Sequence, residues 1–100
     1  MTKIKKYVEE LAEELNGAKK YMEKALEYKA SGNTARYNKY KEMSIQELGH
    51  ATAIHEIAVQ DIEQLKTVYP EIPQKMMSKW EQAHKDFVEK VAWIKQMQSM

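Results

Sequence analysis

Turn-forming residues break this sequence at only two places, and that placement is what most limits its fold. In residues 30–34, Gly32 suits a left-handed helix end, and the Asn-Thr pair after it can cap a following helix. In residues 69–73, two prolines end one helix, and Pro73 fits the first turn of the next. The segments between the breaks are rich in Glu, Lys, Ala, Leu and Met, which are good helix formers. We therefore expect three helices, near residues 3–30, 34–68 and 73–98.

Each expected helix has one apolar face, because apolar residues recur along it in steps of three and four. The residues on these faces are Ile4, Val8, Leu11, Leu15, Ala18, Met22 and Ala25, then Tyr37, Tyr40, Ser44, Glu47, Ala51, Ile54, Ala58, Asp61 and Leu65, and then Met77, Trp80, His84, Phe87, Val91 and Ile94. Three amphipathic helices predict an all-α fold, a helical bundle that forms a single domain over residues 1–100. A chain this short buries a modest core, so we expect self-association or a bound ligand to stabilise it.

Charge and residue usage exclude several classes of function. Sixteen basic and 15 acidic residues give a net charge of +1, which would not steer the chain to nucleic acid or to an anionic membrane. The absence of Cys excludes a disulfide scaffold and a thiol nucleophile. No stretch approaches the roughly 20 apolar residues that span a bilayer, and the first residues lack the apolar core of a signal peptide. We expect a cytoplasmic protein with neither a nucleic-acid nor a membrane partner.

Two glutamates and a histidine interrupt the apolar pattern. Glu47 occupies an apolar-face position in the segment 34–68, and His50 flanks the same face one turn later. In the first segment Glu14 borders the apolar face, whereas its neighbour Glu13 lies among charged residues. A lone carboxylate buried there would cost on the order of several kcal/mol unless it is paired, protonated or bound to a cation.

Counting along the hairpin brings these three residues together. At about 1.5 Å per residue, folding about the first break places position 14 opposite position 51 and position 47 opposite position 18. Glu14, Glu47 and His50 then lie at about the same depth. Two carboxylates and one imidazole that converge in a helical core are ligands for a metal such as Fe or Mn.

The same residues carry a resemblance to a known family. The segment Glu14-Leu-Asn-Gly-Ala-Lys-Lys-Tyr21 resembles the Glu-x6-Tyr pattern in the first helix of rubrerythrins and other ferritin-like proteins, and Glu47-Leu-Gly-His50-Ala resembles the Glu-x-x-His-Ala of their second helix. The resemblance implies that Glu14, Glu47 and His50 ligate metal in a di-iron site that oxidises Fe(II) or reduces O2 or peroxide. Iron is the expected metal, with Mn and Zn as alternatives.

The chain carries half of the ligand set that this resemblance implies. A ferritin-like bundle has four helices, and its usual ligands are four Glu and two His. Two copies related by a two-fold axis would supply all of them through one self-complementary interface. Encapsulated ferritins are similar, since they are short chains that build a di-iron site across a dimer. The expected architecture is therefore a three-helix, ferritin-like antiparallel bundle completed in a homodimer or a higher homo-oligomer.

A second Glu-x-x-His lies in the last expected helix, at Glu81 and His84. These residues could complete the metal site within one chain, or they could form a second cluster with His55 and Asp61. Folding about the second break places position 84 opposite position 56, so the pair would lie about 9–18 Å along the axis from the first group. Glu81 and His84 are thus further candidate ligands whose grouping the sequence leaves open.

Three functions remain after these considerations. The leading one is a metal-binding protein with a Glu/His di-metal site that could oxidise Fe(II) with O2. The second is a non-enzymatic helical interaction module with a ferritin-like shape. The third is a regulator that senses metal or pH through His50, His55 and His84.

Overall fold

A computed structural model describes residues 2–69 and 71–100 of the chain, and it is all-helical over that part. The helices are α1 (Thr2–Ala30), α2 (Thr34–Val68) and α3 (Gln74–Gln98). The all-α class and the three helices are confirmed, and each predicted bound lies within one residue of the observed one. Pro70, which contributed to the second predicted break, lies outside the described residues. Among the residues described, no helix is long and apolar enough to cross a membrane.

The residues of the two breaks end and begin the helices as their chemistry requires. Gly32 adopts a φ of 81°, the left-handed conformation that glycine tolerates best. Asn33 caps α2, because its side-chain oxygen accepts a hydrogen bond from the backbone N–H of Arg36 at 3.1 Å. Pro73 precedes α3 in an extended conformation, so it occupies the cap position and not the first helical turn.

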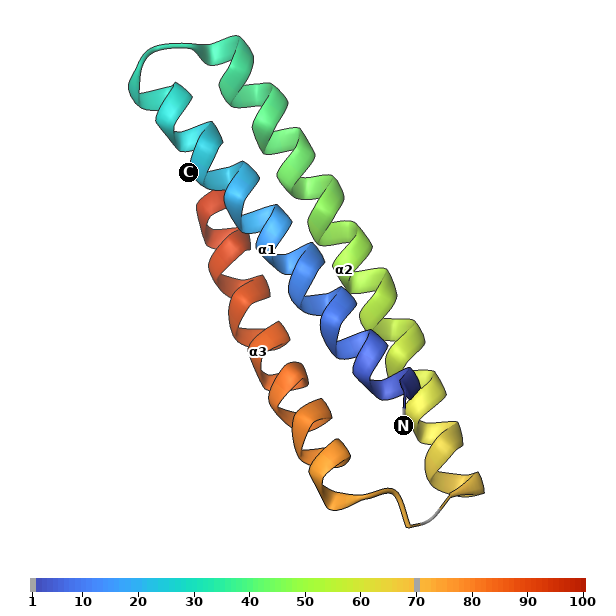
Figure 1. Ribbon diagram of the computed structural model, residues 1–100. Coiled ribbons are helices and arrows are strands. Elements are labelled where there is room, and N and C mark those ends of the chain that lie inside the picture. The colour runs from blue at the N-terminus through green and yellow to red at the C-terminus, as the bar shows by residue number, and fades with distance from the viewer. Residues whose placement is uncertain (1, 70) are drawn as a thin grey trace.

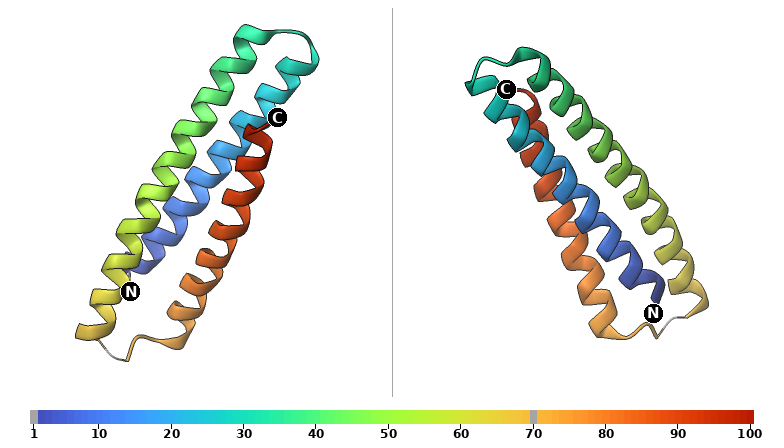
Figure 2. Two further views of the ribbon diagram at one scale, coloured as in Figure 1. Left: turned by 180° about the vertical axis from the view of Figure 1, so that it is seen from behind. Right: turned by 45° about the horizontal axis from the view of Figure 1, so that its top comes forward.

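The three helices lie side by side in an elongated molecule of 55 × 19 × 17 Å. α1 and α3 run in the same direction and α2 runs opposite to both (Figure 1). Figure 2 shows the three helices from behind and with the top tilted forward. α1 packs along both other helices, whereas α2 and α3 touch each other through few residues. α1 is therefore the helix that holds the other two together.

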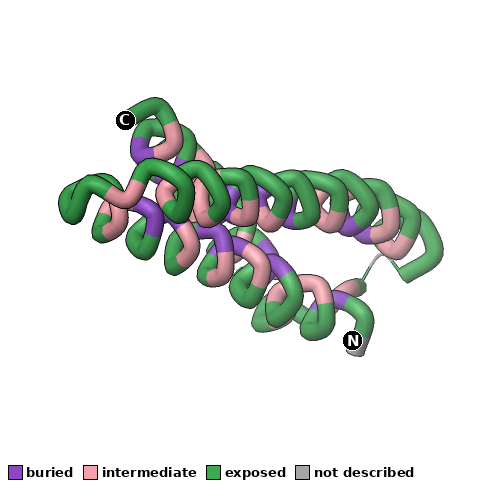
Figure 3. Tube along the Cα trace, turned by 90° about the horizontal axis from the view of Figure 1, so that it is seen from above, coloured by how far each residue is buried: buried purple, intermediate pink, exposed green. Residues whose placement is uncertain are grey.

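The core forms one buried stripe on the inward faces of the helices (Figure 3). Of the seven residues predicted to be buried on α1, only Val8 is partly exposed. On α2 the prediction is partly wrong, because Leu48 and Ile62 are buried, whereas Glu47 and Ile54 are only half-buried at the rim. The buried residues are Ile4, Leu11, Leu15, Ala18, Met22, Ala25, Ser44, Leu48, Ala51, Ala58, Ile62, Trp80, Phe87, Ile94 and Met97.

The rotation of the α2 face has a structural reason. Side chains of α3 cover one flank of α2, where His55 stacks on Phe87 with ring centroids 4.0 Å apart. The buried face of α2 therefore turns toward that flank. Glu47 is left at the opposite edge, next to α1, and that is the place where it meets Glu14.

Candidate metal centre

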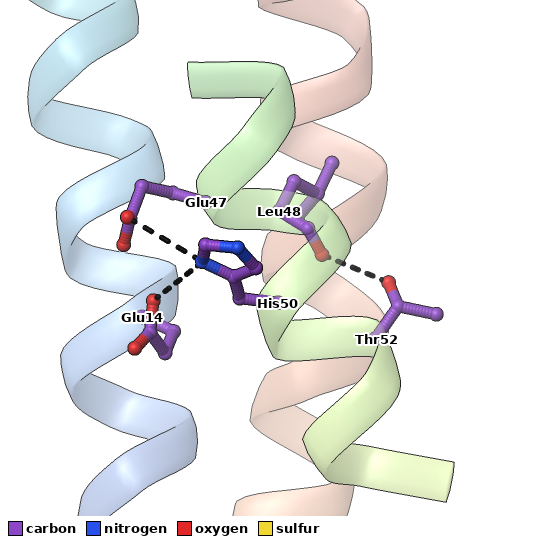
Figure 4. A network of polar contacts seen from close by, with 5 residues as sticks. All are labelled: Glu14, Glu47, Leu48, His50 and Thr52. Atoms are coloured by element: carbon purple, nitrogen blue, oxygen red, sulfur yellow. Dashed lines mark hydrogen bonds and ion pairs between the residues drawn. The ribbon is translucent and has the colours of Figure 1, made fainter. Parts of the chain in front are cut away.

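Glu14 of α1 meets Glu47 and His50 of α2 at one place between the two helices. Each residue offers a ligand atom, and these atoms all lie within 4.8 Å of one another. Nδ1 of His50 is 3.8 Å from Oε2 of Glu14 and 3.6 Å from Oε1 of Glu47. Figure 4 shows the three side chains in front of the helices, with the α3 ribbon behind them. The three residues that the sequence singled out as the first group are thus brought together.

Two contacts set the alignment of α1 and α2 beside this group. The buried hydroxyl of Ser44 donates a hydrogen bond to the carbonyl of Ala18 at 2.7 Å. One turn later the Glu47 side chain lies against Gly17, where an added Cβ atom would be only 3.1 Å from Oε2 of Glu47. Position 47 therefore lies opposite positions 17 and 18, as counting along the hairpin predicted.

The role of Gly17 was missed in the sequence. Glycine is unfavourable in the middle of a helix, and it weakens α1 by about 1 kcal/mol relative to alanine. An isolated glycine three residues after a candidate ligand is the signal that could have found it. Its lack of a side chain gives the Glu47 carboxylate room against the α1 backbone.

The electrostatics of the group disfavour two unpaired carboxylates. The Glu14 and Glu47 side chains are each 27% exposed, and Oε2 of Glu14 is buried without any hydrogen-bond partner. The hydrogen bond that Glu14 can donate to Glu47 once it is protonated, burial, and the negative charge of Glu47 all raise the pKa of Glu14 above its ordinary value. When both groups are ionised, neither can donate a hydrogen bond, so the site gains from a proton or a cation placed between them.

The spacing of the donor atoms fits a small cation. Two ligand atoms that each bind one ion at about 2.1 Å can be no more than about 4.2 Å apart. Both distances from His50 Nδ1 are below that limit, and all the ligand atoms lie within 4.8 Å of one another, so the flexible glutamate ends need at most a small shift to reach one ion. Carboxylate oxygens with an imidazole nitrogen suit Fe, Mn or Zn. The His50 side chain is 64% exposed, so this ligand group opens toward the surface.

The other candidate ligands lie elsewhere. His84 contacts His55, with 2.8 Å between His84 Nδ1 and His55 Nε2, and Glu81 is exposed beside it on α3. The offset of the second hairpin causes this, since counting placed position 84 opposite position 56. Neither Glu81 nor His84 belongs to the group around Glu14, and we do not assign them to the metal site.

Asp61 does not join that histidine pair either. It accepts a hydrogen bond from the Tyr7 hydroxyl and forms an ion pair with Lys3 at 3.1 Å. These two contacts lower the pKa of Asp61, and the same hydrogen bond raises the pKa of Tyr7 to about 12. Of the alternative cluster of Glu81 and His84 with His55 and Asp61, the structure therefore shows only the contact between the two histidines.

The surface grooves between α1 and α3, which share Leu15 and Lys90 in their walls, contain none of the candidate ligands. The Glu14 group lies outside both grooves. No known protein family, no curated protein and no solved structure matches this chain.

Proposed function

We propose that the protein binds transition-metal ions, iron above all, through Glu14, Glu47 and His50, as a ferritin-like protein. The observation that carries the proposal is the buried Oε2 atom of Glu14, which has no hydrogen-bond donor and faces a second carboxylate. A divalent cation supplies the missing partner and balances both negative charges. Iron fits this set of two oxygen donors and one nitrogen donor, and Mn and Zn are the alternatives.

We further propose that two copies of the chain complete a di-metal site. Glu14, Glu47 and His50 are half of the four glutamates and two histidines of a ferritin-like centre. The group opens at the surface of the α1–α2 pair, with His50 largely exposed, so a second copy placed there by a two-fold axis can add its own three ligands. The two copies together then form the antiparallel, ferritin-like bundle that a single chain lacks the helices to build.

The activity that this site supports best is oxidation of Fe(II), which is the substrate. Two Fe(II) ions would each give one electron to O2, which would take up two protons from water and leave as hydrogen peroxide, and both ions would become Fe(III). The residues of the chain bind and orient the ion. Glu14 and Glu47 compensate its charge, and their hard oxygen atoms favour the higher charge of the product. His50 would supply a nitrogen ligand, and Gly17 leaves space for the Glu47 carboxylate.

Oxygen consumption with added Fe(II) tests the activity. The wild type is compared with Glu47→Gln, which removes one charged ligand, and with Glu42→Gln, an exposed position on the same helix. We expect fast consumption by the wild type and by Glu42→Gln, and the background rate with Glu47→Gln. Equal rates for all three proteins would reject the oxidase proposal.

Metal binding and assembly need separate measurements. Equilibrium dialysis with Fe(II) in the absence of O2 gives the number of ions per chain, and the solution mass with and without Fe(II) gives the oligomeric state. One ion per chain in a dimer supports the shared site. A monomer that binds iron would retain the ion site and reject the two-fold completion.

The rival function rests on the proton-sharing that raises the pKa of Glu14. A Glu14–Glu47 pair that holds a proton would satisfy Oε2 without metal, as in a non-enzymatic interaction module. That function predicts no bound metal after growth in iron-rich medium and no change of mass with Fe(II). Elemental analysis of the purified protein separates it from the metal proposal.

A further inference from the structure

His55 of α2 and His84 of α3 form a second polar contact, which involves no carboxylate and lies outside the group of Glu14, Glu47 and His50. His55 Nε2 and His84 Nδ1 are 2.8 Å apart, the ring centroids are 4.9 Å apart, and the ring planes differ by 21°. A nitrogen lies about 1.1 Å from the centre of its ring, so these distances require the two nitrogens to point almost straight at each other. The contact is therefore an N–H···N hydrogen bond in which one ring donates and the other accepts. Metal chelation would need both nitrogens to direct their lone pairs at a third atom, and here they point at each other.

The hydrogen bond lies at the weakest contact between helices. α2 and α3 touch through few residues, and the other side-chain hydrogen bond between them among the described residues is the one from Gln98 to Ser44 at 3.0 Å. His55 is half-buried, its ring lies flat on Phe87, and Trp80 is the next aromatic ring, with centroids 6.0 Å apart. Trp80 and Phe87 are only 7% and 8% exposed, so separation of α3 from α2 would expose them.

We infer that the His55–His84 pair is a proton-operated clasp that holds α3 against α2 at neutral pH and releases it in acid. The pair can hold one extra proton, because an imidazolium still donates to a neutral imidazole, and that charge-assisted bond is strong. A second proton leaves two N–H groups facing each other without an acceptor, and two positive charges repel across the contact. Release therefore needs both rings to be charged.

The surroundings of His55 favour its neutral form. Burial is the main cause that lowers the pKa of His55 below 6.5, and the charge of His84 lowers it further. The titratable groups whose charge reaches His55 are His84 from α3 and Glu56 from its own helix, and Glu56 opposes the shift. The remaining neighbours on α3, Trp80 and Phe87, carry no charge. A His with a lowered folded-state pKa stabilises the fold fully above pH 6.5, and that contribution falls as the pH drops from 6.5 through the folded-state value.

Fluorescence of Trp80 tests the clasp directly. All proteins carry Trp93→Phe, because Trp93 is 55% exposed and would mask the buried tryptophan. EDTA removes any metal. The emission maximum is recorded from about pH 7.5 to about pH 4.5, which covers the titration of histidine. Its wavelength is used and not its intensity, since a nearby imidazolium quenches without moving the maximum. We expect a shift to longer wavelength in acid while far-UV circular dichroism stays unchanged.

Matched variants assign the shift. His84→Gln keeps a hydrogen-bonding partner for His55 but cannot take a proton, so its emission maximum should stay constant over the range. His50→Gln removes the histidine of the carboxylate group and should shift like the parent. If His84→Gln is poorly folded, the double variant His55→Gln/His84→Gln, in which two amides keep the contact, takes its place. The clasp is rejected by a parent that does not shift, or by a glutamine variant that shifts equally.

Discussion

Replacing Glu14 by glutamine should make the metal-free protein more stable and bind metal less well. Two unit charges 4.8 Å apart, the limit within which these ligand atoms lie, repel by about 0.9 kcal/mol in water and by about 3.5 kcal/mol at an effective dielectric constant of about 20. The side chains are about a quarter exposed, so the lower value is the better guide. The glutamine N–H2 also donates to Glu47, which Glu14 cannot do as a carboxylate. We expect a gain of about 1–2 kcal/mol, or roughly 4–16 °C in Tm.

Urea unfolding followed by circular dichroism, with EDTA at about pH 7.5, measures the gain in the metal-free protein. Thermal unfolding with Fe(II) in the absence of O2 measures metal binding, which stabilises the wild type by about 2.7 kcal/mol at a free concentration 100 times Kd. Glu13→Gln is the matched control, since Glu13 is exposed one residue away and its charge is the smallest of the influences that raise the pKa of Glu14, so it should change both quantities much less. A metal-free Glu14→Gln protein that is less stable than the wild type would refute the reasoning, because it would mean that the carboxylate stabilises the fold without a cation.

Three further results are expected. The stability difference between Glu14→Gln and the wild type, from urea unfolding, should shrink as the pH falls from neutral toward about 4.5. The folded-state pKa of Glu14 is raised, so the wild type regains stability as Glu14 takes up its proton. A difference that stays constant with pH would contradict this. Gly17→Ala should raise metal-free stability by up to about 1 kcal/mol yet weaken Fe(II) binding in dialysis, because the new methyl displaces the Glu47 carboxylate; unchanged binding would show that the space is not needed. Ser44→Ala should destabilise by about 1–3 kcal/mol in urea, since Gln98 loses its acceptor, and a neutral effect would show that this contact adds nothing.

The helices and the buried face of α1 could be predicted because they depend on local chemistry. Gly32 ends one helix and Asn33 caps the next through contacts within a few residues, so the local sequence is enough to predict both helix ends. Because α1 packs on both other helices, its apolar residues all face the same side, and their spacing along the sequence is enough to predict that side. The grouping of Glu14 with Glu47 followed from counting across a tight turn, where little error accumulates.

The rest depends on where a distant helix lies. Leu48 and Ile62 are buried because α3 covers one flank of α2, and no periodicity within α2 contains that information. The segment between α2 and α3 is longer than the one between α1 and α2, so the sequence could place His84 near position 56 but could not show that its ring is aligned with His55. The space that Gly17 provides is a property of two side chains on different helices, which spacing along one chain does not reveal.

The glycine beneath the Glu47 side chain also makes the hairpin intolerant of slippage. Moving α2 along α1 by one helical turn, about 5.4 Å, would bring the Glu47 carboxylate over Glu13 or Tyr21, where a side chain fills the space that position 17 leaves empty. A hairpin that slips in this way keeps most of its apolar contacts but separates Glu14 from Glu47 and His50. If the proposed ion binds there, it would stabilise only the alignment in which Glu14, Glu47 and His50 meet, so metal binding would also favour the correct register of the hairpin.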